Sequence, residues 1–290
     1  MALLRACLCL LLLGAPLGAP ASAAERIVSL GGSVTEILYA LGIEDRIVAV
    51  DTTSLYPPEA TELPQVGYLR QLSAEPILGL EPDLVIGTTE AGPPPVLEQI
   101  GSVGTRVVLV EDLPTPEGTV AKIRAVAEAV GEAEQGNALA DSVAAEFAAL
   151  EERLGSLTER PRVLFLLMAS GTAPLAAGSE TAAQGIVELA GGQNAIVGYS
   201  SYKPLSPEAA ATLDPDLLLI SDHGLAGLGG MEGLAARPDL GLMPAVQEGR
   251  VMVMETNLLL GFGPRAPQAA ELLARRLHPT LLGQKGSGTQ

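Results

Sequence analysis

The stretch Leu72-Ser73-Ala74-Glu75-Pro76-Ile77-Leu78-Gly79-Leu80-Glu81-Pro82-Asp83-Leu84 recurs 133 residues later as Leu205-Ser206-Pro207-Glu208-Ala209-Ala210-Ala211-Thr212-Leu213-Asp214-Pro215-Asp216-Leu217. In both copies a serine that can cap a helix precedes a glutamate in the first helical turn, and a Pro-Asp turn then leads into an apolar strand. Unrelated helix–turn–strand units can share such a sequence pattern by chance. Read as a true repeat, the two copies predict two similar lobes, and the cleft between two lobes is a natural ligand site.

Strands and helices alternate on either side of both copies. Apolar strands are expected over 26–30, 46–50 and 106–110 in the first half, and over 163–167, 217–220 and 250–254 in the second. Such alternation predicts an α/β fold with two Rossmann-like lobes, each built on a central, mainly parallel sheet. In sheets of this kind ligands meet the loops at the carboxyl ends of the strands.

The first helix carries a sequence signal for its start. Ser33 is predicted as the N-cap of a helix over 34–41, and Glu36 follows at the spacing of a capping box.

The middle of the chain is helical for almost forty residues, from Glu117 to Leu154, with expected interruptions only near Gly131 and Gly136. The second part of this region is interpreted as a helix that joins the lobes and limits hinge motion. The predicted organisation is a signal peptide over 1–24, an N-terminal lobe over 25–130, a connecting backbone helix over 131–158, a C-terminal lobe over 159–280 and a flexible tail over 281–290.

The N-terminus has the pattern of a secretory signal peptide. Arg5 gives a short basic start, Leu8 to Leu13 form an apolar run, and Ala21-Ser22-Ala23 is a cleavage signal. Both cysteines, Cys7 and Cys9, lie in this leader, so the exported chain has no disulfide and no cysteine ligand or nucleophile. A soluble protein of the bacterial periplasm is expected.

The formal net charge of −17 argues against a nucleic-acid partner, because phosphate binding is carried by clustered Lys and Arg. An enzyme is the rival of a different class. Asp51, Asp83, Asp216 and His223 could form a metal or acid–base site, but no nucleophile elbow or His-Glu metal motif is present. No catalytic activity is expected.

Four stretches carry a resemblance to a known family. They are 26–37 (Arg-Ile-Val-Ser-Leu-Gly-Gly-Ser-Val-Thr-Glu-Ile), 66–75 (Val-Gly-Tyr-Leu-Arg-Gln-Leu-Ser-Ala-Glu), 202–208 (Tyr-Lys-Pro-Leu-Ser-Pro-Glu) and 261–265 (Gly-Phe-Gly-Pro-Arg). In this order they resemble the periplasmic hemin-binding proteins of bacterial ABC-type heme importers. That class of substrate-binding protein also carries cobalamin and ferric siderophores, which are the alternative ligands. The resemblance covers essentially the whole mature chain, and the stretch from Gly67 to Glu75 is the part that points to heme.

The resemblance implies that Tyr68 is the axial ligand of the heme iron, and the chemistry agrees, since a phenolate is a hard anionic donor for ferric iron. Arg70 shares a face with Tyr68 on an extended loop, so it could assist the phenolate or bind a propionate. The alternative is a Tyr68 that packs the lobe with its hydroxyl bonded to backbone.

A second axial ligand is less well marked. Some members of the family carry a His-Gly pair where this chain reads Met168-Ala169-Ser170-Gly171, which puts a ligand from that loop in doubt. Met168 could offer a thioether but is more typical of a core residue. Five-coordinate iron held by Tyr68 alone is therefore expected. The further candidates for the heme pocket or its propionates are Tyr199, Tyr202, Lys203, His223, Arg237 and Arg265.

Glu75 and Glu208 resemble the acidic residues, one on each lobe, that dock this class of protein to arginine clusters on a dimeric membrane permease. They also suit the first turn of a helix, where negative charge is favourable. The expected partners are heme and the permease dimer of the inner membrane, with the protein itself a monomer.

Overall fold

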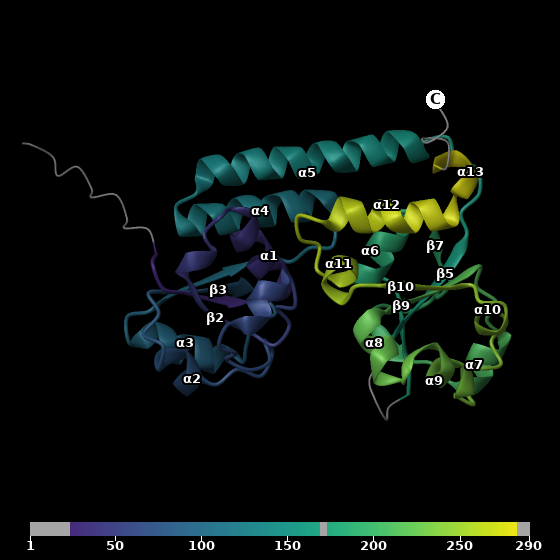
Figure 1. Ribbon diagram of the computed structural model, residues 1–290, viewed down its shortest axis with the longest axis horizontal. Coiled ribbons are helices and arrows are strands. Elements are labelled where there is room, and N and C mark those ends of the chain that lie inside the picture. The colour runs from purple at the N-terminus through teal and green to yellow at the C-terminus, as the bar shows by residue number, and fades with distance from the viewer. Residues whose placement is uncertain (1–23, 169–172, 283–290) are drawn as a thin grey trace, which may run out of the picture.

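The computed structural model describes residues 24–168 and 173–282 and contains two α/β lobes side by side beneath a layer of long helices (Figure 1). The predicted signal peptide, apart from Ala24, lies outside the described residues, as do Ala169, Ser170, Gly171 and residues 283–290. None of the described helices is long and apolar enough to cross a membrane.

The first lobe is built on four parallel strands in the order β2-β1-β3-β4. They are β1 (Ile27–Leu30), β2 (Ile47–Val50), β3 (Leu84–Thr88) and β4 (Arg106–Val110). Alternate residues of the buried strands β1 and β3 face opposite sides of the sheet. One side packs against α1 (Gly32–Ala40) and α4 (Pro116–Val130), and the other against α2 (Ala74–Leu78) and α3 (Pro94–Ser102). Two short 3₁₀ turns, Glu44–Arg46 and Pro58–Glu62, complete this lobe.

The second lobe contains a mixed sheet in the order β10-β9-β5-β6-β8, with β7 paired to β5. The strands are β5 (Arg162–Leu167), β6 (Leu175–Ala177), β7 (Gln193–Asn194), β8 (Tyr202–Pro204), β9 (Leu217–Ser221) and β10 (Val251–Met254). The pairs β10–β9, β5–β9 and β5–β7 are parallel, whereas β6 is antiparallel to β5 and to β8. The helices are α6 (Ala182–Leu189), α7 (Pro207–Thr212), α8 (Asp222–Gly227), α9 (Gly230–Ala236), α10 (Pro244–Gln247), α11 (Thr256–Leu260), α12 (Ala266–Leu277) and α13 (Pro279–Leu282).

The sequence repeat corresponds to a structural repeat. Helix α2 precedes β3 and helix α7 precedes β9, and each of these strands pairs in parallel with the first strand of its lobe. The aspartate of each Pro-Asp turn binds that neighbouring strand: Asp83 accepts a hydrogen bond from the Arg26 N–H at 3.1 Å, and Asp216 accepts one from the Arg162 N–H at 2.7 Å. The prediction of two similar lobes is confirmed.

The serines of the repeat differ in detail. Ser206 caps α7, since its hydroxyl accepts from the Ala209 N–H at 3.1 Å, whereas Ser73 occupies the N-cap of α2 without such a bond.

The long helices form the layer above both lobes. Helix α5 (Ala133–Leu154) lies across the top, with α4 and α12 beneath it (Figure 1). Gly131 ends α4 in the left-handed conformation at φ 84°, as expected of a C-terminal glycine. The expected interruption near Gly136 is wrong. This glycine lies in the first turn of α5, where an added Cβ would come 2.0 Å from the Ala127 Cβ, so it permits close packing of α4 against α5.

The predicted start of the first helix is also wrong. Helix α1 begins at Gly32 with Gly31 as its N-cap, because the Gly31 carbonyl accepts from the Val34 and Thr35 N–H groups. Ser33 is buried, and its hydroxyl accepts a hydrogen bond from Lys122 Nζ at 3.2 Å. These tertiary contacts override the local capping signal.

Candidate functional site

A cavity of about 570 Å³ lies between the lobes at the carboxyl ends of β1, β3 and β5. The first lobe contributes Gly31, Gly32, Ser33, Thr53, Tyr68, Leu69, Arg70, Thr88, Glu90 and Asp112 to its lining. The second lobe contributes Leu167, Glu180, Thr181, Ala182, Ser201, Tyr202, Thr256, Asn257, Leu260, Gly261 and Phe262. The cleft predicted between the two lobes is therefore present.

The loop after β2 presents Tyr68 to this cavity. Its neighbour Leu69 is buried in the first-lobe core, and the Thr52 N–H donates to the Gly67 carbonyl at 3.0 Å. The loop is thus fixed on both sides of Tyr68, which remains 39 % exposed. A tyrosine packed away inside the lobe, the alternative weighed from the sequence, is not what the structure shows.

Arg70 binds the phenol of Tyr68 directly. Arg70 Nη1 donates to Tyr68 Oη at 2.7 Å, and Arg70 Nη2 lies 2.5 Å from Glu90 Oε2. The hydrogen bond from Arg70 to Glu90 is the main reason why the pKa of Arg70 is raised above its ordinary value. Arg70 therefore holds a permanent positive charge against the Tyr68 oxygen, where it would stabilise a phenolate.

Glu90 belongs to this group although the sequence analysis did not identify it. It follows β3, and its loop is held against the Tyr68 loop by two backbone bonds, Gly92 N–H to the Leu69 carbonyl at 2.9 Å and Leu72 N–H to the Gly92 carbonyl at 2.8 Å. Its position two residues beyond a buried strand, at the carboxyl edge of a parallel sheet, was the available signal.

Tyr202 is the predicted pocket residue that lines the cavity from the second lobe. Its ring packs edge-on against Phe165, with 6.3 Å between ring centroids. Burial is the largest cause of a raised pKa for Tyr202, and the nearby Glu90 carboxylate raises it further, although hydrogen bonds involving Ala183 and Thr181 oppose the shift. Tyr202 is thus a neutral phenol that faces the Arg70–Glu90 pair from the opposite wall.

The other predicted pocket residues do not line this cavity. The Tyr199 hydroxyl donates to the Ala176 carbonyl at 3.3 Å, and Lys203 Nζ lies 4.8 Å from the centroid of the Tyr199 ring. His223 is exposed near the start of α8. Arg237 forms a two-pronged ion pair with Asp239.

Arg265 and Met168 also have other surroundings. Arg265 Nη2 lies 2.9 Å from Glu36 Oε2 and 3.1 Å from Glu255 Oε2, so its charge is neutralised by two carboxylates. Met168 is buried in the second-lobe core, as is typical of a methionine that fills space between apolar side chains.

Several polar contacts join the lobes, some of them between residues that line the cavity. The Asn257 amide donates to the Thr53 carbonyl at 3.0 Å, and the buried Lys122 donates to the Gly261 carbonyl at 3.1 Å while also pairing with Asp112. The Arg265 guanidinium lies over the Tyr56 ring, 3.3 Å from its centroid. These contacts link the two lobes beside the cavity.

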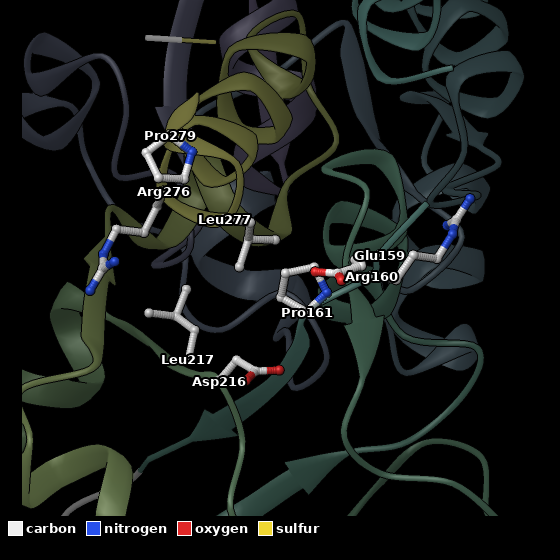
Figure 2. A pocket seen from close by; sticks show the side chains of 8 residues that line it. All are labelled: Glu159, Arg160, Pro161, Asp216, Leu217, Arg276, Leu277 and Pro279. Atoms are coloured by element: carbon white, nitrogen blue, oxygen red, sulfur yellow. The ribbon is translucent and has the colours of Figure 1, made fainter. Parts of the chain in front are cut away.

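The carboxylates considered for an enzyme site are used structurally. Asp51 accepts hydrogen bonds from the Gly31 N–H and from Thr53 and Ser54, and Asp83 binds the start of β1. Asp216 lines a separate hollow of about 380 Å³ at the amino ends of the second-lobe strands, where Arg276 and Pro161 also lie (Figure 2). Within residues 24–168 and 173–282, no group of three or more His, Cys, Asp or Glu side chains could hold a metal ion.

A sequence profile of the family described as periplasmic binding protein matches residues 27–258. The vitamin B12-binding protein of Yersinia pestis is 32% identical over 205 residues, which cover 70% of this chain and 71% of that relative.

Solved structures of similar proteins agree with the fold. The periplasmic heme-binding protein RhuT from Roseiflexus sp. RS-1 is 42% identical with a TM-score of 0.84, and the match covers 89% of this chain and 99% of that one. The periplasmic heme-binding protein BhuT, solved in complex with two hemes, is 41% identical with a TM-score of 0.80, covering 88% and 98%. The periplasmic heme-binding protein HutB of Vibrio cholerae is 37% identical with a TM-score of 0.76, covering 88% and 99%.

Proposed function

Because the chain belongs to the periplasmic binding protein family, we propose that it captures heme in the periplasm and delivers it to an ABC importer of the inner membrane. The observation that carries this proposal is the pair formed by Tyr68 and Arg70 on the wall of the interlobe cavity. Ferric iron is a hard acid, and tyrosine is an established axial ligand of heme iron. The Arg70 guanidinium that donates to the Tyr68 oxygen would stabilise the negative charge of a phenolate bound to the metal.

The remaining cavity suits a flat, largely apolar molecule. Leu167 and Leu260, both partly exposed, offer apolar surface, and Tyr202 offers an aromatic wall opposite Tyr68. Iron held by Tyr68 alone, with the heme face against the second lobe, is the arrangement we propose. Arg70 and Tyr202 form its immediate surroundings. The residues that do not line the cavity remain predictions for the heme pocket or its propionates: Tyr199, Lys203, His223, Arg237 and Arg265.

Delivery requires a surface for the permease. We propose that Glu75 on α2 and Glu208 on α7 supply it, since both are exposed and equivalent in the repeat. Figure 1 shows α2 and α7 low on their respective lobes, on the side away from α5. Two like charges on the same side of the molecule suit a dimeric partner that offers one basic patch per subunit. The protein would act as a monomer, exported by the predicted signal peptide.

Cobalamin is the second candidate, favoured by the similarity to vitamin B12-binding proteins. Cobalamin would make no use of a tyrosine that is bound to an arginine in the cleft, and the heme-binding structures are more similar in sequence. Binding without turnover is expected, since the family and the structural neighbours are binding proteins and not enzymes.

A titration separates these ligands. Purified protein lacking the signal peptide is mixed in turn with hemin, cyanocobalamin and a ferric hydroxamate siderophore, and binding is followed by absorption and by retention on a desalting column. Stoichiometric retention of hemin alone supports the proposal. Retention of cobalamin or the siderophore in preference to hemin would refute it.

A further inference from the structure

Among the described residues, helix α1 has no side-chain cap at its start on the cavity floor, although the buried Asp51 accepts a hydrogen bond from the Gly31 N–H just before it. Its N-cap residue is Gly31, which has no side chain, and its first turn contains no acidic residue. Within the described part of the chain, the backbone N–H groups of Gly32 and Ser33 have no hydrogen-bond acceptor. The first N–H groups of a helix carry partial positive charge, and those left without a cap are commonly satisfied by water or by an anionic ligand.

A buried hydroxyl beside this helix end is also without a partner. Thr88, the last residue of β3, is 2 % exposed, and its Oγ1 makes no hydrogen bond to any described residue. Thr88 lines the cavity, and a Cβ placed on Gly31 would lie 3.8 Å from this oxygen. Buried polar groups are almost always hydrogen-bonded in native proteins, so an unpartnered one on a ligand cavity points to a group supplied by the ligand.

The charges around the cavity leave few places for an anion. Three carboxylates, Glu90, Asp112 and Glu180, belong to its lining, and the lining cation Arg70 is already bound to Tyr68 and Glu90. The cations predicted from the sequence as partners for propionates have other partners: Arg265 pairs with Glu36 and Glu255, Lys203 lies over Tyr199, and Arg237 pairs with Asp239. The donors at the α1 terminus are therefore the best match for a carboxylate.

We propose that the Gly32 and Ser33 N–H groups and the Thr88 hydroxyl form a carboxylate subsite on the cavity floor. The inference rests on the proposed function, under which the carboxylate is a propionate of heme. The subsite requires glycine at positions 31 and 32, because neither position accepts a side chain. Gly31 has φ 104°, which disfavours any side chain, and a Cβ on Gly32 would lie 2.3 Å from Asn257 Nδ2, so side chains are excluded from this end of the helix. The carboxylate would thus meet bare backbone donors.

The test compares hemin with its dimethyl ester, in which both propionates have lost their charge. Affinities are measured by absorption titration for the wild type, Thr88→Val, Thr88→Ser and the control Thr89→Val, whose exposed side chain does not line the cavity. Thr88→Val should weaken hemin binding about tenfold, in line with one hydrogen bond to a charged group. It should leave the affinity for the ester unchanged, and Thr88→Ser should restore hemin binding.

A thermal melt of the free protein excludes a folding defect. Because Thr88→Val removes a buried hydroxyl that no described residue binds, the melting temperature of the variant should equal or exceed that of the wild type. Thr88→Val that binds both hemin and the ester as the wild type does would overturn the subsite while leaving the proposed function standing. A wild-type protein that binds no hemin would overturn the proposed function instead, and with it the assignment of the carboxylate to a propionate.

Discussion

Arg265 of the second lobe lies over the first lobe with its Nη2 2.9 Å from Glu36 Oε2, and its backbone N–H donates to Glu36 Oε1 at 3.0 Å. Glu36 is only 5 % exposed. The two residues are 229 positions apart in the sequence and join α1, which forms part of the cavity floor, to the start of α12. The relationship makes Arg265 a bridge between the lobes and removes it from the free cations of the cleft.

Replacement of Arg265 should therefore destabilise the fold. Arg265→Ala leaves the buried Glu36 carboxylate without its ionic partner, which costs about 3 kcal/mol. Urea unfolding followed by circular dichroism measures the loss. Arg124→Ala is the matched control, because Arg124 and Asp141 form an exposed pair whose removal should cost no more than about 1 kcal/mol. Equal losses for the two variants would contradict the bridge.

Removal of the Arg70 guanidinium should weaken binding of heme. Arg70→Gln leaves the Tyr68 oxygen without its charge-assisted hydrogen bond, and the loss corresponds to about a tenfold lower affinity for hemin. Arg160→Gln removes an exposed arginine that does not line the cleft cavity and should leave the affinity unchanged. An Arg70→Gln protein with wild-type affinity would show that the hydrogen bond to Tyr68 has no part in binding.

The two glutamates of the repeat should affect transport and not capture. Glu75→Ala combined with Glu208→Ala is expected to retain heme affinity while uptake by the membrane importer falls severalfold, since each lobe loses its charge for the permease. Uptake of hemin into vesicles that contain the importer measures the effect. Glu151→Ala with Glu152→Ala removes the same charge from α5, on the opposite side of the molecule, and should transport normally. Loss of heme affinity in the Glu75 and Glu208 variant would contradict the docking role.

The sequence predicted best those features of the fold that depend on local residue patterns. The repeat around Glu75 and Glu208 predicted two helix–turn–strand units because the periodicity of short helices and buried strands is a local property. The pairing of Tyr68 with Arg70 was predicted from a shared face on an extended loop, and that reason is wrong. Residues 68–71 form a turn closed by the Gln71 N–H bond to the Tyr68 carbonyl at 2.8 Å, and Arg70 reaches the Tyr68 phenol from within this turn.

Long-range contacts account for what the sequence did not reveal. The capping signal at Ser33 failed because Lys122, 89 residues away, binds the Ser33 hydroxyl. Glu90 reaches Arg70 only through the packing of two loops. Whether any described residue binds the Thr88 hydroxyl depends on everything packed around β3, and none does. Cations such as Arg265 look alike in a sequence whether they are free or paired, so their roles depended on the tertiary structure.

The absorption spectrum of the ferric heme complex tests the central claim most directly, with Tyr68→Phe compared against the wild type and against Tyr202→Phe. Tyr68→Phe keeps the aromatic ring and removes only the oxygen that we propose binds iron. The wild type and Tyr202→Phe should both give a high-spin ferric spectrum typical of phenolate ligation, and Tyr68→Phe should lose it. An unchanged spectrum for Tyr68→Phe would contradict the account, because the iron would then be held by another residue.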